Sequence, residues 1–97
     1  DYQGAIADFN KAIEINSNSE LAYFNRGNTK GSLKDYDGAI ADYSKTIEIN
    51  PNNGSAYKNR GIAKELIGDL KGACADWRRA SAMGLKKTDL WILTQCY

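Results

Sequence analysis

The chain repeats one phrase at a spacing of 34 residues, and this period constrains its fold more than any other feature. The phrase begins at Asp1, Asp35 and Asp69, and its first two copies agree at 12 of 16 positions. The segments between the copies also match, since residues 21–34 and 55–68 share Ala-Tyr, Asn-Arg-Gly and Lys. Such a period predicts a stack of two-part units, each of which buries its apolar face against its neighbours.

Both parts of the unit have the apolar spacing of an α-helix. In residues 35–50 the apolar side chains lie three, four or seven positions apart, which places them on one helical face. Asp35 can cap that helix and Asn50-Pro51 ends it, because the residue before a proline avoids the α-helical region. Asn52 or Asn53 can cap the helix that follows. We therefore expect an all-α solenoid of antiparallel pairs with six helices, at residues 2–15, 19–32, 36–49, 53–66, 70–82 and 87–96.

Two glycines fall in the middle of predicted helices, at Gly27 and Gly61. A glycine there costs about 1 kcal/mol relative to alanine. Its recurrence in both units predicts that the next helix approaches closely, with Ala39 and Ala73 as the small residues that meet it. The alternative is that both glycines were copied with the repeat and are tolerated.

Composition argues against several classes of function. The net charge is +1, so no concentrated basic surface is expected for nucleic acid or for an anionic membrane. No apolar run has the roughly 20 residues of a membrane span. The chain lacks histidine, the commonest general base and metal ligand, and it has no phosphate-binding glycine loop. We expect no catalysis, no cofactor, no metal, no nucleic-acid partner and no membrane partner.

Cys74 and Cys96 are the only cysteines, and they form no Cys-x-x-Cys motif. Isolated cysteines of this kind are typical of reducing compartments, so we expect free thiols and a cytoplasmic location. The alternative is a disulfide between these two residues.

The unit resembles the tetratricopeptide repeat, whose pattern is W-x2-L-G-x2-Y, then A-x3-F, then P. The pattern positions of the first full unit hold Tyr23, Arg26, Gly27, Lys30, Ala39, Tyr43 and Pro51. Those of the second hold Tyr57, Arg60, Gly61, Lys64, Ala73, Trp77 and Leu85, and the opening half-unit supplies Ala5, Phe9 and Ser17.

The resemblance implies a right-handed solenoid with repeats at residues 19–52 and 53–86. Residues 1–16 would be the second helix of a repeat whose first helix is absent. Residues 87–97 would be a capping helix, with Leu90 and Trp91 covering helix 70–82, or else the start of a further repeat.

Two arginines depart from the family pattern, since Arg26 and Arg60 stand where it has leucine. A half-buried arginine needs a partner. We expect each to pair across the packed helices with a repeated aspartate, from the set Asp8, Asp42 and Asp76. The alternative is a solvated arginine whose stem covers the neighbouring helix.

The resemblance implies a non-catalytic protein–protein interaction module that binds a peptide or protein segment in a concave groove. The first helix of each pair would line this groove, which gives as candidates Leu21, Phe24, Asn25, Asn28, Ser55, Lys58, Asn59, Ile62 and Glu65. Asparagine can bond a peptide backbone as donor and as acceptor, or can be plain polar surface. A family clamp for C-terminal carboxylates is not expected, because its basic positions hold Phe24, Asp89 and Leu93.

Two other functions stay open, namely structural self-assembly by helix exchange or end-to-end stacking, and service as a regulatory appendage of a larger enzyme. Self-assembly would make a homo-oligomer through the exposed face of helix 2–15. We expect Tyr2, Ile6, Phe9 and Ile13 to include unusually exposed apolar residues or to contact another molecule.

Overall fold

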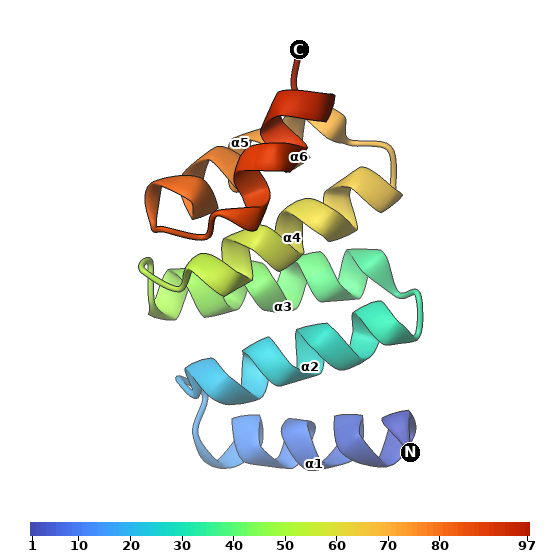
Figure 1. The fold of residues 1–97 in the computed structure, drawn as a ribbon. Helices are drawn as coiled ribbons and strands as arrows, with labels where there is room; N and C mark the ends of the chain where they lie inside the picture. Colours follow the sequence, from blue (N-terminus) through green and yellow to red (C-terminus); the bar gives the residue numbers. More distant parts are fainter.

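The computed structural model describes all residues 1–97, which form six α-helices in a single stack (Figure 1). The helices are α1 (Tyr2–Ile15), α2 (Glu20–Ser32), α3 (Tyr36–Ile49), α4 (Gly54–Leu66), α5 (Leu70–Ala82) and α6 (Lys87–Gln95). Each helix packs on the next, so the N-terminus and the C-terminus lie at opposite ends of a stack whose longest dimension is 42 Å. The predicted all-α solenoid is confirmed, and every predicted helix end lies within one residue of the observed end.

Each of the first five helices begins at a capping side chain. The caps are Asp1, Ser19, Asp35, Asn53 and Asp69, and each accepts a hydrogen bond from a backbone N–H of the first turn. Such a cap stabilises a helix by about 1 kcal/mol, because it satisfies an N–H that the helix itself leaves free. The predicted caps at Asp35 and Asn53 are confirmed, whereas α6 starts at Lys86 without a side-chain cap.

The turn after α2 contains Lys34, a non-glycine residue with a positive φ of 63°. Its counterpart one repeat later is Gly68, with φ 89° in the turn after α4. A left-handed conformation costs about 1 kcal/mol for a residue with a Cβ. We expect Lys34→Gly to raise the free energy of unfolding by about 1 kcal/mol in urea denaturation. The reciprocal change Gly68→Lys should lower it by a similar amount, and equal effects of one sign would contradict this account.

Gly27 and Gly61 lie where an aromatic side chain of the next helix crosses their own. A Cβ at Gly27 would lie 2.9 Å from a ring carbon of Tyr43, and one at Gly61 would lie 2.5 Å from Trp77 Nε1. The predicted close approach is therefore confirmed. The space is filled by the aromatic rings, however, and not by the predicted alanines, of which Ala73 contributes only its carbonyl oxygen at 3.2 Å.

The predicted arginine–aspartate pairs join the two helices of each full repeat. Arg26 donates from Nε and Nη2 to the Asp42 carboxylate at 2.8 and 2.7 Å. Arg60 donates in the same way to Asp76 at 2.9 and 2.7 Å. The carboxylate hydrogen bond raises the pKa of both arginines above its ordinary value. Asp8, the third member of the predicted set, is exposed and forms no ion pair.

A third guanidinium nitrogen of each arginine reaches the preceding repeat, a contact that was not predicted. Arg26 Nη1 donates to Asn10 Oδ1 at 2.8 Å, and Arg60 Nη1 donates to Ser44 Oγ at 3.1 Å. A lysine four residues after each arginine adds a second cation beside the same aspartate, at 3.3 Å for Lys30. Each arginine thus connects three successive helices.

A disulfide between Cys74 and Cys96 fastens α6 to α5, with Cα atoms 5.7 Å apart. The expectation of free thiols is therefore wrong. The two cysteines are 22 residues apart in sequence, and only the folding of α6 back onto α5 brings them together. Because reducing compartments keep thiols reduced, the cysteines no longer support a cytoplasmic location.

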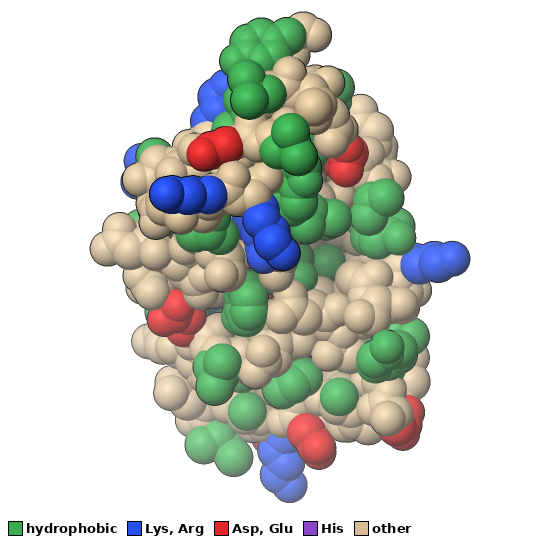
Figure 2. Space-filling model, in the orientation of Figure 1, with side chains coloured by type: hydrophobic (Ala, Val, Ile, Leu, Met, Phe, Trp, Pro, Cys, Tyr) green, Lys and Arg blue, Asp and Glu red, His purple; other side chains and the backbone are tan.

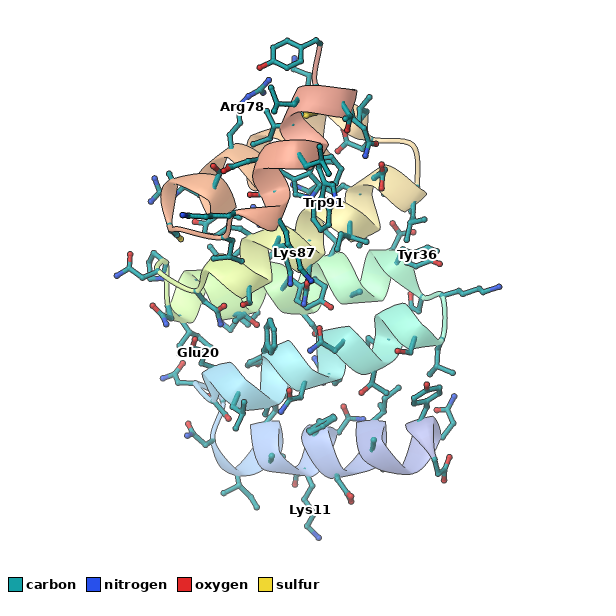
Figure 3. All side chains as sticks on the ribbon, viewed as in Figure 1. Lys11, Glu20, Tyr36, Arg78, Lys87 and Trp91 are labelled. Carbon is teal, nitrogen blue, oxygen red and sulfur yellow. A yellow bond between two sulfur atoms is a disulfide. The ribbon has the colours of Figure 1, made fainter.

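Trp91 is the aromatic residue with which α6 covers α5, and its ring centroid lies 5.3 Å from that of Trp77. Figure 3 shows Trp91 pointing from α6 into the stack. The prediction that Leu90 shares this role is wrong, since its side chain is 62% exposed. The helical period places Leu90 on the outward side of α6, one position away from the packed face.

The opening helix α1 contains no fully buried residue. Of the four apolar residues expected to be exposed there, Tyr2 is 54% exposed and the other three are half-buried. No helix in the structure combines the length and the apolar character that a membrane crossing requires.

Candidate functional site

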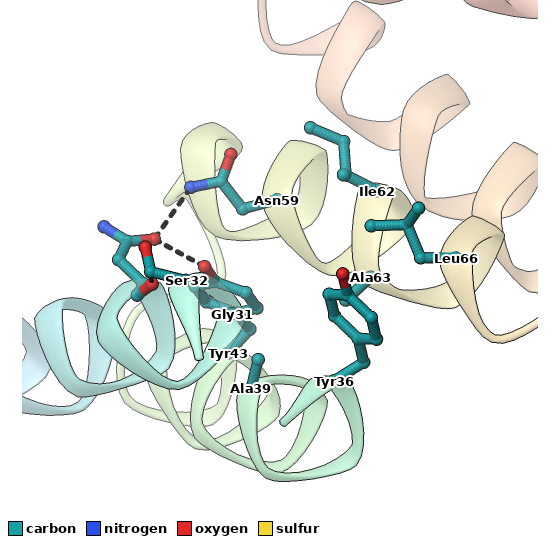
Figure 4. A pocket seen from close by; sticks show the side chains of 10 residues that line it. Gly31, Ser32, Tyr36, Ala39, Tyr43, Asn59, Ile62, Ala63 and Leu66 are labelled. Atoms are coloured by element: carbon teal, nitrogen blue, oxygen red, sulfur yellow. Dashed lines mark hydrogen bonds between the residues drawn. The ribbon is translucent and has the colours of Figure 1, made fainter. Parts of the chain in front are cut away.

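A groove of about 380 Å³ opens between α2, α3 and α4 (Figure 4). Its lining residues are Asn28, Gly31, Ser32, Tyr36, Ala39, Tyr43, Asn59, Ile62, Ala63 and Leu66. None of these side chains is charged, and small residues on all three helices leave the space between them open. Figure 2 shows hydrophobic side chains spread over one face of the whole molecule, with charged residues of both signs scattered among them.

The groove brings together three of the nine predicted candidates, Asn28, Asn59 and Ile62. The other six lie outside it, and all nine stay predictions as ligand-binding residues. Among them, Leu21 is 67% exposed, and the Phe24 ring lies 5.9 Å from the Tyr43 ring, against which it packs. The remaining four are Asn25, Ser55, Lys58 and Glu65.

Sequence reasoning missed the contribution of α3 to the groove. Tyr36, at the start of α3, points toward Ile62 and Leu66 of α4 (Figure 4). The resemblance assigned the lining to the first helix of each pair alone. The available signal was the row of small residues at Gly31, Ala39 and Ala63, because small side chains on packed helices leave space between them that larger ones would fill.

Two amides and a phenol form a hydrogen-bonded chain at one side of the groove. Tyr43 Oη donates to Asn28 Oδ1 at 2.5 Å, and Asn59 Nδ2 donates to the same oxygen at 3.1 Å. These bonds leave the Asn28 amide N–H groups and the Asn59 carbonyl oxygen without a protein partner. The groove therefore offers a free donor and a free acceptor from two neighbouring helices (Figure 4).

Burial raises the pKa of Tyr43 to about 12, from an ordinary value of 10.0. The folded state therefore favours the neutral phenol, and this stabilisation is complete below pH 10 and is lost as the pH rises toward 12. We expect Tyr43→Phe to weaken the fall in unfolding free energy across this range, as measured by urea denaturation at several pH values. Tyr97→Phe, at a 93% exposed position, should leave the profile unchanged. Identical profiles for wild type and Tyr43→Phe would contradict the assignment.

The ion pairs described above hold the three groove helices in place. Asp42 is only 3% exposed and joins α3 to α2 through Arg26. Arg60 joins α4 to α3 through Ser44. Glu20, the first residue of α2, links this helix to the turn between α3 and α4. Its carboxylate accepts hydrogen bonds at 2.9 Å from the side-chain amides of Asn50 and Asn53.

Two sequence models of one repeat family match the chain. A tetratricopeptide repeat model matches residues 21–53, and a second model of the same repeat matches residues 1–33. Together they cover more than half of the sequence. The chain belongs to the tetratricopeptide repeat family. A comparison of this tetratricopeptide repeat chain with curated protein sequences finds no significant match.

Solved structures with the same arrangement of helices support this assignment. MamA is 33% identical with a TM-score of 0.84, over 91% of this chain and 52% of the MamA chain. The chain therefore spans about half the length of MamA. The Arabidopsis OM64 TPR domain is 28% identical with a TM-score of 0.87, over 92% of this chain and 75% of that domain.

A third similar structure is the first TPR of Spaghetti (RPAP3), which was solved bound to an HSP90 peptide. It is 22% identical with a TM-score of 0.83, over 96% of this chain and 81% of that one. At this level of identity the likeness supports the tetratricopeptide repeat fold.

Proposed function

We propose that this tetratricopeptide repeat chain is a non-catalytic interaction module that binds an extended, uncharged peptide segment in the groove between α2, α3 and α4. The observation that carries the proposal is the groove itself, an open apolar hollow bordered by amide groups that have no protein partner. Its ten lining residues include six hydrophobic ones and no charged one. A charged side chain placed there would lose hydration without gaining an ion pair, which favours a neutral ligand.

The free polar groups of the groove match the two hydrogen-bonding groups of a peptide unit. The Asn28 amide can donate to a backbone carbonyl, and the Asn59 carbonyl can accept from a backbone N–H. Ile62, Leu66 and Tyr36 then surround the apolar side chain of the next ligand residue. This division, with backbone bonds for affinity and an apolar hollow for selectivity, is common in peptide recognition.

The Spaghetti (RPAP3) structure supports a peptide as the class of ligand, since that domain holds an HSP90 peptide. The present chain would use a different ligand chemistry, because its groove lacks charged residues. A role as a regulatory appendage of a larger enzyme is the alternative that uses the same groove.

Selection of phage-displayed random peptides on the wild-type chain tests the proposal, followed by fluorescence-anisotropy titration of the enriched peptides. We expect apolar, uncharged peptides whose affinity falls at least about tenfold in Leu66→Arg, which corresponds to about 1.4 kcal/mol. Leu66 is 55% exposed, so the substitution places the charge in the groove without disturbing the core.

Leu93→Arg is the matched control, because Leu93 is 67% exposed on α6, outside the groove, and its replacement should leave binding unchanged. Equal loss in both variants, or selection of peptides that end in acidic residues, would rule out this binding mode.

A further inference from the structure

The turn between α3 and α4 holds the only Asn-Gly pair of the chain, at Asn53 and Gly54. Asparagine followed by glycine is the pair most open to loss of the side-chain amide, because no Cβ shields the glycine nitrogen that attacks it. The equivalent positions one repeat earlier and one repeat later hold Ser19-Glu20 and Lys87-Thr88, so no asparagine precedes a glycine there.

The packing of the fold requires the glycine of this pair. Gly54 is buried in the first turn of α4, and a Cβ there would lie 2.7 Å from Leu85 Cδ1 and 3.3 Å from Met83 Cβ. Contacts this short would force the turn after α5 to move. The reactive pair therefore cannot be removed at the glycine without disturbing how α4 packs on that turn.

Glu20 holds the asparagine of the pair in place. Its Oε2 atom accepts a hydrogen bond at 2.9 Å from Asn53 Nδ2 and another at 2.9 Å from Asn50 Nδ2. Asn53 Oδ1 accepts from the Ala56 backbone N–H at 3.0 Å and so caps α4. Figure 3 shows Glu20 at the end of α2 that faces this turn. Since both polar atoms of the Asn53 side chain are bonded, it cannot turn toward the Gly54 nitrogen without breaking these bonds.

We propose that Asn53 is a deamidation site whose rate is controlled by Glu20, and that the reaction uncouples α2 from the turn between α3 and α4. A bond forms between the Gly54 nitrogen and Asn53 Cγ, and the bond from Cγ to Nδ2 breaks. The amide NH2 leaves as ammonia with the proton of the Gly54 nitrogen, and a cyclic imide remains. Water then opens the imide at either carbonyl, which gives aspartate or isoaspartate.

Both products break the contact with Glu20. A carboxylate at this position has no N–H to donate, so a second negative charge lies beside the Glu20 carboxylate where a hydrogen bond lay before. Isoaspartate also lengthens the backbone by one carbon at the residue that caps α4. The reaction therefore replaces an attraction between α2 and the turn with a repulsion.

Peptide mapping by mass spectrometry, during incubation at mildly alkaline pH, tests the site. We expect the folded chain to lose ammonia from Asn53 at least about tenfold more slowly than a synthetic peptide of residues 47–58, because the folded chain must first open the turn. Glu20→Ala should raise the rate in the folded chain at least about fivefold, since it removes a hydrogen bond to a charged acceptor. A folded chain that reacts as fast as the peptide would overturn the proposal.

Glu48→Ala is the matched control, because this exposed carboxylate near the end of α3 pairs with Lys45 and not with the turn. Its rate should equal that of the wild-type chain. Circular dichroism at the incubation temperature establishes that each variant is folded. Equal rates in Glu20→Ala and Glu48→Ala would contradict control of the site by Glu20.

A double-mutant cycle tests the effect of the product without any incubation. Asn53→Asp should lower the melting temperature by at least about 4 °C when Glu20 is present. In the Glu20→Gln background the same change should cost nothing, because glutamine carries no charge and aspartate caps a helix as well as asparagine does. Equal losses in the two backgrounds would rule out the repulsion and with it the uncoupling of α2.

Discussion

Replacement of Asp42 by alanine is expected to lower the free energy of unfolding by about 3 kcal/mol. The Asp42 side chain is 5% exposed and lies beside Arg26 and Lys30, whose side chains are only 18% and 24% exposed. Removal of the carboxylate leaves two cations in a largely dehydrated site without a counter-charge. The loss of one member of a buried ion pair is costly for this reason, even where the intact pair contributes little by itself.

The repeat provides a matched control for this substitution. Asp8 occupies the same position of the unit but is exposed and unpaired, so Asp8→Ala should change the free energy of unfolding by no more than about 0.5 kcal/mol. Asp76→Ala should resemble Asp42→Ala, since its carboxylate binds Arg60 and Lys64 in the same geometry. Urea denaturation of the three variants makes the comparison, and similar effects at Asp8 and Asp42 would refute the role of the ion pair.

Reduction of the disulfide is expected to lower the free energy of unfolding by about 3 kcal/mol, the value for a closed loop of this size. The bond joins residues 22 apart and holds α6 against α5. Apart from the bond, α6 is held chiefly by Trp91 and Ile92, which pack on α5, and it begins without a side-chain cap. Without the bond, a nine-residue helix is too short to persist unless it stays packed.

Thermal unfolding with and without dithiothreitol measures this effect, together with the loss of helical signal from α6. A double variant, Cys74→Ala with Cys96→Ala, should show the lower stability in both conditions. This variant also controls for effects of the reductant on the rest of the chain. An oxidised wild-type chain no more stable than the double variant would show that packing alone holds α6.

Much of the fold could be predicted because the apolar spacing and the capping residues recur in each copy of the 34-residue unit. The apolar period, the capping residues and Asn50-Pro51 act within a few residues of each helix end, and the predicted bounds were correct to one residue. The pairs of Arg26 with Asp42 and of Arg60 with Asp76 were predictable because a half-buried cation requires a partner. The second helix of the repeat offered such a partner in its recurring aspartate.

The candidate site was less predictable, because a groove depends on which side chains leave space. Tyr36 lines the groove from a second helix, and its contribution follows from the small residues between the helices. The bonds that join Asn28 to Tyr43 and Asn59 depend on side-chain orientations across three helices. No spacing along one helix encodes such an arrangement.

The number of helices, their ends, the all-α repeat fold and the residue types that pair at the packed interfaces could all be predicted before the structure was known. They follow from local spacing and from chemistry repeated every 34 residues. Three features became visible only in the folded chain: the bond between Cys74 and Cys96, the packing of Trp91 rather than Leu90 on α5, and the lack of a cation beside Asp8. Each of these depends on a distance between residues far apart in the chain. Equivalent positions of a repeat share their sequence, but their surroundings differ between the middle of a stack and its ends.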